Sequence, residues 1–346
     1  MEFLLDYGLF LAKVVTFVVA FMVVVGFVVA STQREKGKDK GRIQVTRLND
    51  RFDEMNHALK IEVVEEKVLK EEEKKRKKAE KQARKQKKGG AESVRKRRVY
   101  VLDFNGDMKA SATDDLRESI TAVLSLAEPV DEVVVRLESP GGVVHGYGLA
   151  ASQLDRIRQK KIPLTVCVDK VAASGGYMMA CVADKIVAAP FAVLGSIGVV
   201  AQLPNFHKVL KKHDVDYEIF TAGEYKRTVT MLGENTEKGR QKFKEDLDDT
   251  HMLFKEFVQE HRPSVNVDEV ATGEIWFGRR ALEKNLIDVI STSDEYLTSL
   301  HPASDLVLVN YEHKKRIQER IGLAAGRALE AAFENTIAKF AQRPWF

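Results

Sequence analysis

Short apolar stretches alternate with helical patterns from Val99 onward, and this alternation limits the fold more than any other feature of the sequence. The strand-like stretches lie at residues 99–104, 132–137, 164–168, 185–189 and 216–221, and the helical patterns at 112–127, 145–160, 203–213 and 236–260. Strands separated by helices form βαβ units, in which the strands are mainly parallel. We therefore predict one α/β domain with a mainly parallel sheet over residues 99–300, which is long enough to enclose a single core.

Apolar residues near the N-terminus form a stretch that is long enough to cross a bilayer. Residues 8–30 are 23 positions interrupted by a single charge, Lys13. At about 1.5 Å per residue this stretch is roughly 34 Å long, and the hydrocarbon core of a bilayer is about 30 Å thick. A cleaved signal peptide would begin with positive charge, whereas Glu2 and Asp6 are acidic. We predict that residues 1–31 are a retained transmembrane anchor.

The segment between the anchor and the domain, residues 32–98, is highly charged. Residues 65–88 hold 12 Lys or Arg against 6 Glu, an excess of +6, whereas the whole chain carries only +4. So few apolar residues cannot bury a core, but Glu, Lys, Ala and Arg are good helix formers. We predict a helical or disordered spacer that can touch anionic lipid headgroups. The run 65–88 lacks aromatic side chains that stack on bases, so we expect no nucleic-acid partner.

Two further apolar patterns need an interpretation. Residues 301–346 include an amphipathic helical pattern at 316–340, and such a tail can pack on the domain, on a neighbouring subunit or on a membrane surface. The apolar stretch 186–204 is interrupted by a proline and two glycines. It is therefore expected to form two buried strands joined by a turn, and not a second membrane span.

Ser174 is the most informative single residue for function. It follows the strand-like stretch 164–168 and stands in the sequence Ala-Ser-Gly-Gly-Tyr, before small and apolar residues that can pack as a helix. A strand-to-helix turn exposes a side chain and backbone N–H groups, and the start of a helix favours negative charge. On this pattern alone an ordinary N-cap serine is the more frequent case, and a nucleophile is the alternative.

A second turn, Ser-Pro-Gly-Gly at residues 139–142, follows the strand-like stretch 132–137. Proline fixes one backbone angle, and the glycines allow positive φ and the close approach of a substrate backbone. Such a turn can aim main-chain N–H groups at a developing oxyanion, although a plain connection from strand to helix is the more frequent case. The amides of Gly142 and Gly175 are the candidate oxyanion hole.

Lys226 stands in the polar stretch Gly-Glu-Tyr-Lys-Arg, 52 residues after Ser174. A lysine in such a stretch is usually a solvated charge. A serine nucleophile needs a group that takes its proton, and lysine can do so only when desolvation or nearby positive charge lowers its pKa from about 10.4. Arg227 is one such charge. From the residues alone, both a surface role and a basic role remain open for Lys226.

Together these motifs resemble peptidase family S49, the signal peptide peptidase A family. The resemblance covers most of the chain and extends to Gly-Ser-Ile-Gly-Val at 195–199 and Gly-Arg-Arg-Ala at 278–281. The order and spacing of the motifs make the match specific. It implies a ClpP/crotonase-type fold, with Ser174 as the nucleophile that attacks a peptide carbonyl. It also implies that Lys226 is the general base and the proton donor to the leaving amine.

The resemblance also implies assembly, location and substrate. Members of the family form rings that enclose the active sites, so we expect a homo-oligomer whose serine and lysine can come from different protomers. They act at the outer face of the bacterial inner membrane, which implies a periplasmic domain tethered through residues 8–30. The positive charges at 34–42 favour the cytoplasmic side instead. The expected substrates are peptides near the membrane, such as remnant signal peptides or unfolded segments.

Histidine and cysteine offer few alternatives to this chemistry. His145 is the one histidine close to these motifs in sequence and competes as a general base, although it is also suited to begin or cap a helix. No histidine pair has the spacing of a metal site, and Cys167 and Cys181 do not form a Cys-x-x-Cys motif. We expect both cysteines to be buried free thiols, and we expect no metal and no cofactor.

Two functions from other classes remain as alternatives. Crotonase relatives use similar turns to bind acyl-CoA thioesters without a nucleophile, which would make Ser174 and Lys226 incidental. A membrane-anchored scaffold would keep the fold without turnover and bind partners through the spacer and the terminal helix. Acyl transfer from a CoA thioester without peptide hydrolysis would favour the first alternative. Normal function after Ser174→Ala would favour the second.

Overall fold

The computed structural model describes residues 41–71 and 95–313, together with short pieces at 8, 11, 13–19, 74–75 and 78. Two compact units are distinguished, and the fold described below is that of the larger, Ile43–Tyr311.

The predicted anchor at 1–31 and the predicted tail helix at 316–340 fall wholly or mostly outside the described residues. Within the described part of the chain, no helix combines the length and the apolar character that a membrane crossing needs.

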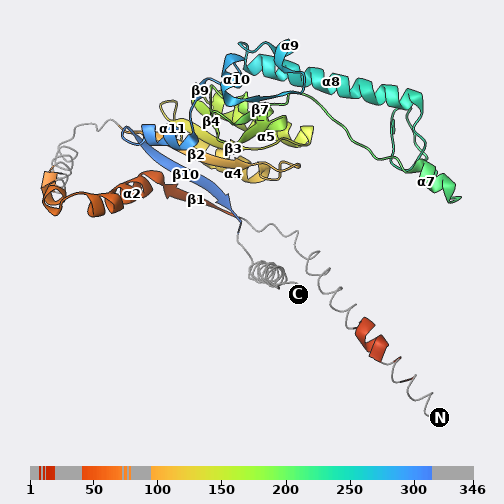
Figure 1. The fold of residues 1–346 in the computed structure, drawn as a ribbon, viewed down its shortest axis with the longest axis horizontal. Helices are drawn as coiled ribbons and strands as arrows, with labels where there is room; N and C mark the ends of the chain where they lie inside the picture. The colour runs from red at the N-terminus through yellow and green to blue at the C-terminus, as the bar shows by residue number, and fades with distance from the viewer. Residues whose placement is uncertain are drawn as a thin grey trace, which may run out of the picture. The chain divides into compact units, whose positions relative to one another are not determined.

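A seven-stranded sheet forms the centre of the larger unit (Figure 1). In spatial order its strands are β1 (Arg42–Arg47), β10 (Ser304–Glu312), β2 (Arg97–Asn105), β3 (Glu132–Glu138), β4 (Leu164–Val168), β6 (Lys185–Ala188) and β9 (Val289–Ile290). Every neighbouring pair from β10 to β9 is parallel. The prediction of a mixed α/β fold with a mainly parallel sheet is therefore confirmed.

A second, three-stranded sheet holds β5 (Val171–Ala173) beside β7 (Val193–Gly195), with β8 (Ile275–Phe277) at its other edge. The β5–β7 pair is parallel and the β7–β8 pair is antiparallel. The predicted pair of strands in 186–204 corresponds to β6 and β7, joined by a turn. This small sheet matters for function because β5 leads directly into Ser174.

Alternate residues of the central strands pack on opposite faces of the large sheet. In β2, Tyr100, Leu102 and Phe104 belong to the core on one face, whereas Val99 and Val101 belong to the core on the other. The first core includes side chains of α4 (Thr113–Leu124), α5 (Val144–Gln159) and α6 (Gly175–Ala180), and the second those of α2 (Leu48–Val63) and α11 (Ser293–Leu300). Because both faces are buried, the strands are continuous apolar runs.

The fold begins earlier and ends later than residues 99–300. Both β1 and α2 lie in the segment predicted to be a spacer, and Leu48 at the start of α2 is buried against the sheet with Val99 and Leu306. The compact unit accordingly spans Ile43–Tyr311. Within this highly charged segment, Leu48 packs against the sheet and the adjacent Asn49 hydrogen-bonds to β10.

The predicted strand at 216–221 is wrong, because this segment has an irregular backbone. Its apolar side chains are exposed, and Phe220 is 89% accessible. A strand needs a neighbour for its N–H and C=O groups, and no described strand pairs with this segment. The short helix α7 (His207–Lys212) before it also buries no residue.

The long helix α8 (Glu237–His261) begins at Thr236, whose hydroxyl accepts a hydrogen bond of 3.1 Å from the Gly239 amide. Only its C-terminal half is anchored, through the buried Phe254 and Val258. Figure 1 shows α7 near the opposite, N-terminal end of α8, away from the sheets. After α8, the short helices α9 (Val267–Val270) and α10 (Gly278–Glu283) return the chain to the sheet.

Candidate active site

Ser174 occupies a strained turn between β5 and α6. Its φ is 50° and its ψ is −119°, a conformation that residues other than glycine rarely adopt and that is frequent at functional sites. The turn is fixed because the Ser174 amide donates to the Gly195 carbonyl at 2.8 Å. The serine side chain makes no capping hydrogen bond. Ser174 therefore does not serve as an ordinary N-cap, and its half-exposed hydroxyl is available to a substrate.

The Ser-Pro-Gly-Gly turn lies directly against Ser174. The Ser139 amide donates to the Val171 carbonyl at 2.8 Å, and the Ala173 amide donates to the Ser139 carbonyl at 3.0 Å. Gly141 has a φ of 89°, and a Cβ added there would lie 2.8 Å from the Ser174 Cβ. Only glycine fits this position, so the turn and the strand end that the sequence analysis singled out are brought together.

The amide of Gly175 directly follows Ser174, and the amide of Gly142 belongs to the Ser-Pro-Gly-Gly turn that packs against it. No backbone hydrogen bond from either amide is found among the described residues. For Gly175 the reason is that it opens α6, where amides have no acceptor within the helix. Both glycines line a cavity together with Ser174. Such an arrangement can stabilise negative charge on an oxygen bound there.

Two hollows meet at Ser174. One is a cavity of about 420 Å³ whose wall is mainly apolar, with Val144, Met178, Leu253, Phe254 and Phe257 among its lining residues. The other is a groove of about 970 Å³ that runs along both glycine-bearing turns and the 196–200 loop. Ser174 and Gly142 line both hollows. An extended ligand in the groove can therefore place one apolar group in the cavity.

Lys226 lies in an exposed turn, in which its amide donates to the Gly223 carbonyl at 3.2 Å. This turn is attached to the beginning of α8, because Glu224 pairs with Lys238 at 2.6 Å. The hydrogen bond from Lys238 lowers the pKa of the Glu224 carboxyl.

The same attachment separates the two candidate catalytic residues. Thr250, which lines the cavity at Ser174, follows Lys238 by 12 residues on α8. At about 1.5 Å per residue this is a distance of roughly 18 Å along the helix. Lys226 lines neither of the two hollows. The described chain therefore does not bring Ser174 and Lys226 together within one copy.

Comparison with known proteins decides the family. The model of the peptidase family S49 N-terminal region matches residues 2–154, and the model of peptidase family S49 matches residues 156–306. The probable protease SohB of Haemophilus influenzae is 52% identical over 330 residues, which cover 94% of this chain and 93% of that protein. The chain belongs to peptidase family S49.

A second relative of this S49 protease is the probable protease SohB of Buchnera aphidicola subsp. Acyrthosiphon pisum, 52% identical over 323 residues, which cover 92% of this chain and 93% of that protein. Among solved structures, the 1510-N membrane-bound stomatin-specific protease in complex with a substrate peptide matches with a TM-score of 0.41 and 16% identity, covering 66% of this chain and 99% of that one.

The structure separates the competing histidine of this S49 chain from Ser174 and places another histidine in the groove. His145 is exposed on α5 and lines neither hollow at Ser174. His251, which the sequence analysis did not single out, lines the groove, and its Nε2 lies 3.2 Å from the Ile197 carbonyl. Its position three residues before the buried Phe254, on the same side of α8, is the signal that could have identified it.

The two cysteines are buried free thiols, as predicted. Burial raises the pKa of the Cys167 thiol to about 12, and burial likewise raises that of Cys181. Both thiols therefore stay protonated at neutral pH and are poor nucleophiles.

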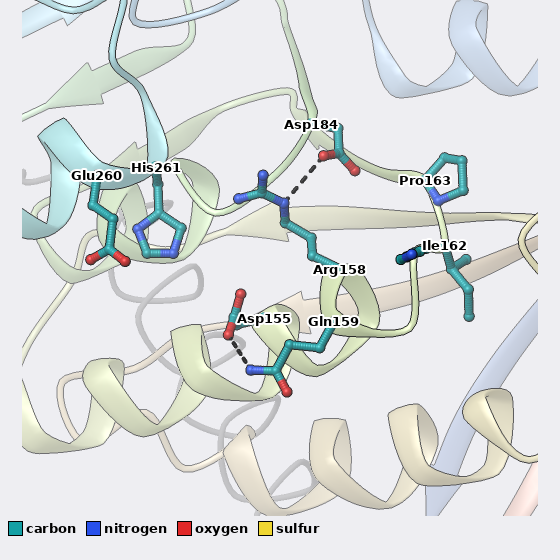
Figure 2. Close-up of a pocket in the computed structure, with 9 residues that line it drawn as sticks. Asp155, Arg158, Gln159, Ile162, Pro163, Asp184, Glu260 and His261 are labelled. Atoms are coloured by element: carbon teal, nitrogen blue, oxygen red, sulfur yellow. Dashed lines mark hydrogen bonds and ion pairs between the residues drawn. The ribbon is translucent and has the colours of Figure 1, made fainter.

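Another cavity of this S49 chain, of about 700 Å³, lies beside the C-terminal part of α5 and is shown in Figure 2. Its lining is polar, with an ion pair of 3.2 Å between Arg158 and Asp184 and a hydrogen bond of 2.6 Å between Gln159 and Asp155. It contains no serine, threonine or cysteine. The cavity has no hydroxyl or thiol nucleophile, so Ser174 remains the centre of the candidate active site.

Proposed function

We propose that this S49 protease is a serine endopeptidase with Ser174 as the nucleophile and Lys226 as the general base. The observation that carries the proposal is the strained turn at Ser174, which holds an uncapped hydroxyl in a cavity bordered by two backbone amides that have no backbone acceptor among the described residues. Nucleophilic serines are commonly held on such strand-to-helix turns. The test is peptide hydrolysis by the wild type and by Ser174→Ala.

The proposed reaction has two steps. Lys226 takes the proton from the Ser174 hydroxyl as its oxygen bonds to the peptide carbonyl, and the amides of Gly142 and Gly175 stabilise the resulting oxyanion. The protonated lysine then gives that proton to the leaving amine, and the C–N bond breaks. In the second step the neutral lysine takes a proton from a water molecule as the water oxygen bonds to the acyl carbonyl. The bond between that carbonyl and the Ser174 oxygen then breaks, and the lysine returns its proton to Ser174, which releases the acid and restores the neutral lysine.

We propose that Lys226 reaches Ser174 of a neighbouring subunit in a homo-oligomer. Apolar residues close to it in sequence are exposed, with Phe220 at 89% and Tyr225 at 49% accessibility. A second copy that covered these side chains would also remove water from Lys226, and desolvation lowers the pKa of a lysine toward the value that a base needs. We also propose that the fold is of the ClpP/crotonase type, as the resemblance to family S49 implies.

The apolar cavity beside Ser174 supports a preference for an apolar side chain immediately before the cleaved bond. Gly148 lines this cavity, and a Cβ added there meets no atom within 4 Å. Gly148→Leu is therefore expected to fill the cavity without a clash and to fit an α-helix at least as well as glycine. Hydrolysis of peptides with Leu or Phe at that position should fall by about 10- to 200-fold in kcat/KM, while peptides with Ala should be cleaved as before.

A matched control is His145→Leu, which adds the same side chain to the same helix at an exposed position outside both hollows. It should leave both classes of peptide unaffected. Equal loss for Ala and Phe peptides in Gly148→Leu would contradict the assignment of the cavity to that side chain. Loss of all activity in His145→Leu would indicate that His145, and not Lys226, is the general base.

We also propose that residues 1–31 anchor the chain in the bacterial inner membrane, with the peptidase unit in the periplasm. The length of the apolar stretch 8–30 supports the anchor. Alkaline phosphatase fused after residue 346 is expected to be active in cells, and green fluorescent protein at the same position is expected to be dark. The reverse pattern would place the unit in the cytoplasm, as the charges at 34–42 favour.

A further inference from the structure

Tyr147 lies behind the candidate oxyanion hole. It touches Gly175 directly and is linked through Ser139 to Gly141, which adjoins Gly142. It is on α5, its side chain is fully buried, and its ring packs edge-to-face on Phe104 with centroids 6.5 Å apart. A Cβ added to Gly175 would overlap the Cγ atom of this ring. The backbone that carries the Gly175 amide therefore rests directly on the tyrosine ring.

The hydroxyl of Tyr147 begins a directed chain of hydrogen bonds that ends at the amide of Gly141, the residue before Gly142. It donates to the Asp107 carbonyl at 2.7 Å, which can only accept. The Ser139 hydroxyl, 2.5 Å away, must then donate to the tyrosine oxygen. The Ser139 oxygen in turn accepts the Gly141 amide at 3.1 Å. Each hydroxyl in this chain has both a donor and an acceptor.

The chain of hydroxyls is tightly enclosed. Gly106 lies against it, and a Cβ added there would lie 2.5 Å from the Tyr147 oxygen and would also overlap the Ser139 hydroxyl. Burial raises the pKa of Tyr147, so its hydroxyl keeps the proton that it donates to Asp107. If the hydroxyl were removed, the Ser139 proton and the Asp107 carbonyl would lose their partner in a space with little freedom to adjust.

We propose that Tyr147 is a positioning residue that holds the amides of Gly142 and Gly175 in register for the oxyanion. Its ring supports Gly175, and its hydroxyl fixes Ser139, which fixes Gly141 and thereby the adjoining Gly142. The inference rests on the proposed function of Ser174, and it adds a residue that never contacts the substrate. Donors must be held close to their productive geometry to stabilise a transition state, because small displacements weaken the hydrogen bonds to the oxyanion.

The test is Tyr147→Phe, which keeps the ring and removes only the hydroxyl. Peptide hydrolysis should lose about 10- to 100-fold in kcat with little change in KM, because the interaction lost is made mainly in the transition state. A peptide aldehyde forms a tetrahedral adduct with a serine and places an oxygen in the hole. Its inhibition constant should rise by a similar factor in Tyr147→Phe.

The matched control is Tyr296→Phe on α11. The Tyr296 hydroxyl also makes two hydrogen bonds, of 2.6 Å to Glu132 and 3.3 Å to Thr165, far along the chain from the Ser174 turn. This variant should lose stability in thermal unfolding without losing kcat or aldehyde affinity. Ser139→Ala removes the middle hydroxyl of the chain and should reproduce the kcat and aldehyde effects of Tyr147→Phe. It replaces Tyr147→Phe as the test variant if Tyr147→Phe does not fold.

Two outcomes would overturn the positioning role. One is wild-type kcat and aldehyde affinity in both Tyr147→Phe and Ser139→Ala. The other is an equal loss of kcat in Tyr147→Phe and Tyr296→Phe, which would mean that both hydroxyls serve only the fold. Failure of the proposed function looks different, because Ser174→Ala would then cleave peptides as well as the wild type in the same assay.

Discussion

Ser174→Ala is expected to lower peptide hydrolysis by about three to six orders of magnitude while the fold stays intact. The substitution removes the oxygen that would bond to the peptide carbonyl and leaves the Cβ in place. Alanine and serine meet the positive φ of 50° at this turn with similar strain, and the serine side chain makes no capping hydrogen bond that would be lost. The measurement is hydrolysis of casein or an unstructured peptide by the detergent-solubilised full chain, with thermal unfolding alongside.

The control for this experiment is Ser299→Ala on α11. Its hydroxyl donates only to the Tyr296 carbonyl at 2.7 Å, and it lines neither hollow at Ser174. This variant should cleave peptides like the wild type. If Ser174→Ala were equally active, the serine mechanism would be wrong. Acyl transfer from a CoA thioester, measured on the same preparations, would then favour the acyl-CoA alternative, and its absence would favour a scaffold.

The strands of the central sheet could be predicted from the sequence because they are buried on both faces. In β3 and β4, Val133, Val135 and Val166 pack on one face while Val134 and Cys167 pack on the other. Other parts of the same chain bury both faces of these strands, so their apolar composition predicts their structure correctly. The segment 216–221 also contains residues that favour strands, Tyr217, Ile219 and Phe220, but no described strand lies beside it and its side chains remain in solvent. Composition indicates a preference for strand, and only long-range pairing decides whether a strand forms.

The candidate site was predictable where short motifs determine it. Glycine and proline specify the turn at 139–142, and the sequence around Ser174 specifies a turn between strand and helix. The links between motifs were not predictable, because they depend on contacts across many residues. The hydroxyl chain joins Tyr147 to Asp107, 40 positions earlier. The bond of His251 to Ile197 spans 54 positions. A tyrosine or histidine on a helix carries no local sign of such a partner.

Mixed oligomers of Ser174→Ala and Lys226→Ala are expected to regain hydrolysis that neither variant has alone. Each variant should lose about as much activity as Ser174→Ala, since both members of the dyad act as a unit. If the lysine comes from a neighbouring subunit, an interface is active when it joins an intact serine to an intact lysine. With random assembly of equal amounts, about a quarter of the interfaces in a ring meet this condition. Co-expression with two different tags and tandem purification would isolate the mixed oligomers.

The matched control mixes Lys226→Ala with the double variant Ser174→Ala/Lys226→Ala, because no interface in that oligomer has a lysine at this position. It should stay inactive, so that any recovery in the first mixture comes from pairing between subunits. Exposed Lys226 makes no side-chain hydrogen bond or ion pair among the described residues, so its removal should leave unfolding unchanged. Mixed oligomers that form but stay inactive would contradict pairing across the interface. The distance of roughly 18 Å along α8 between Lys238 and Thr250 would then have to close within one chain, by a movement of the whole 199–236 segment toward Ser174.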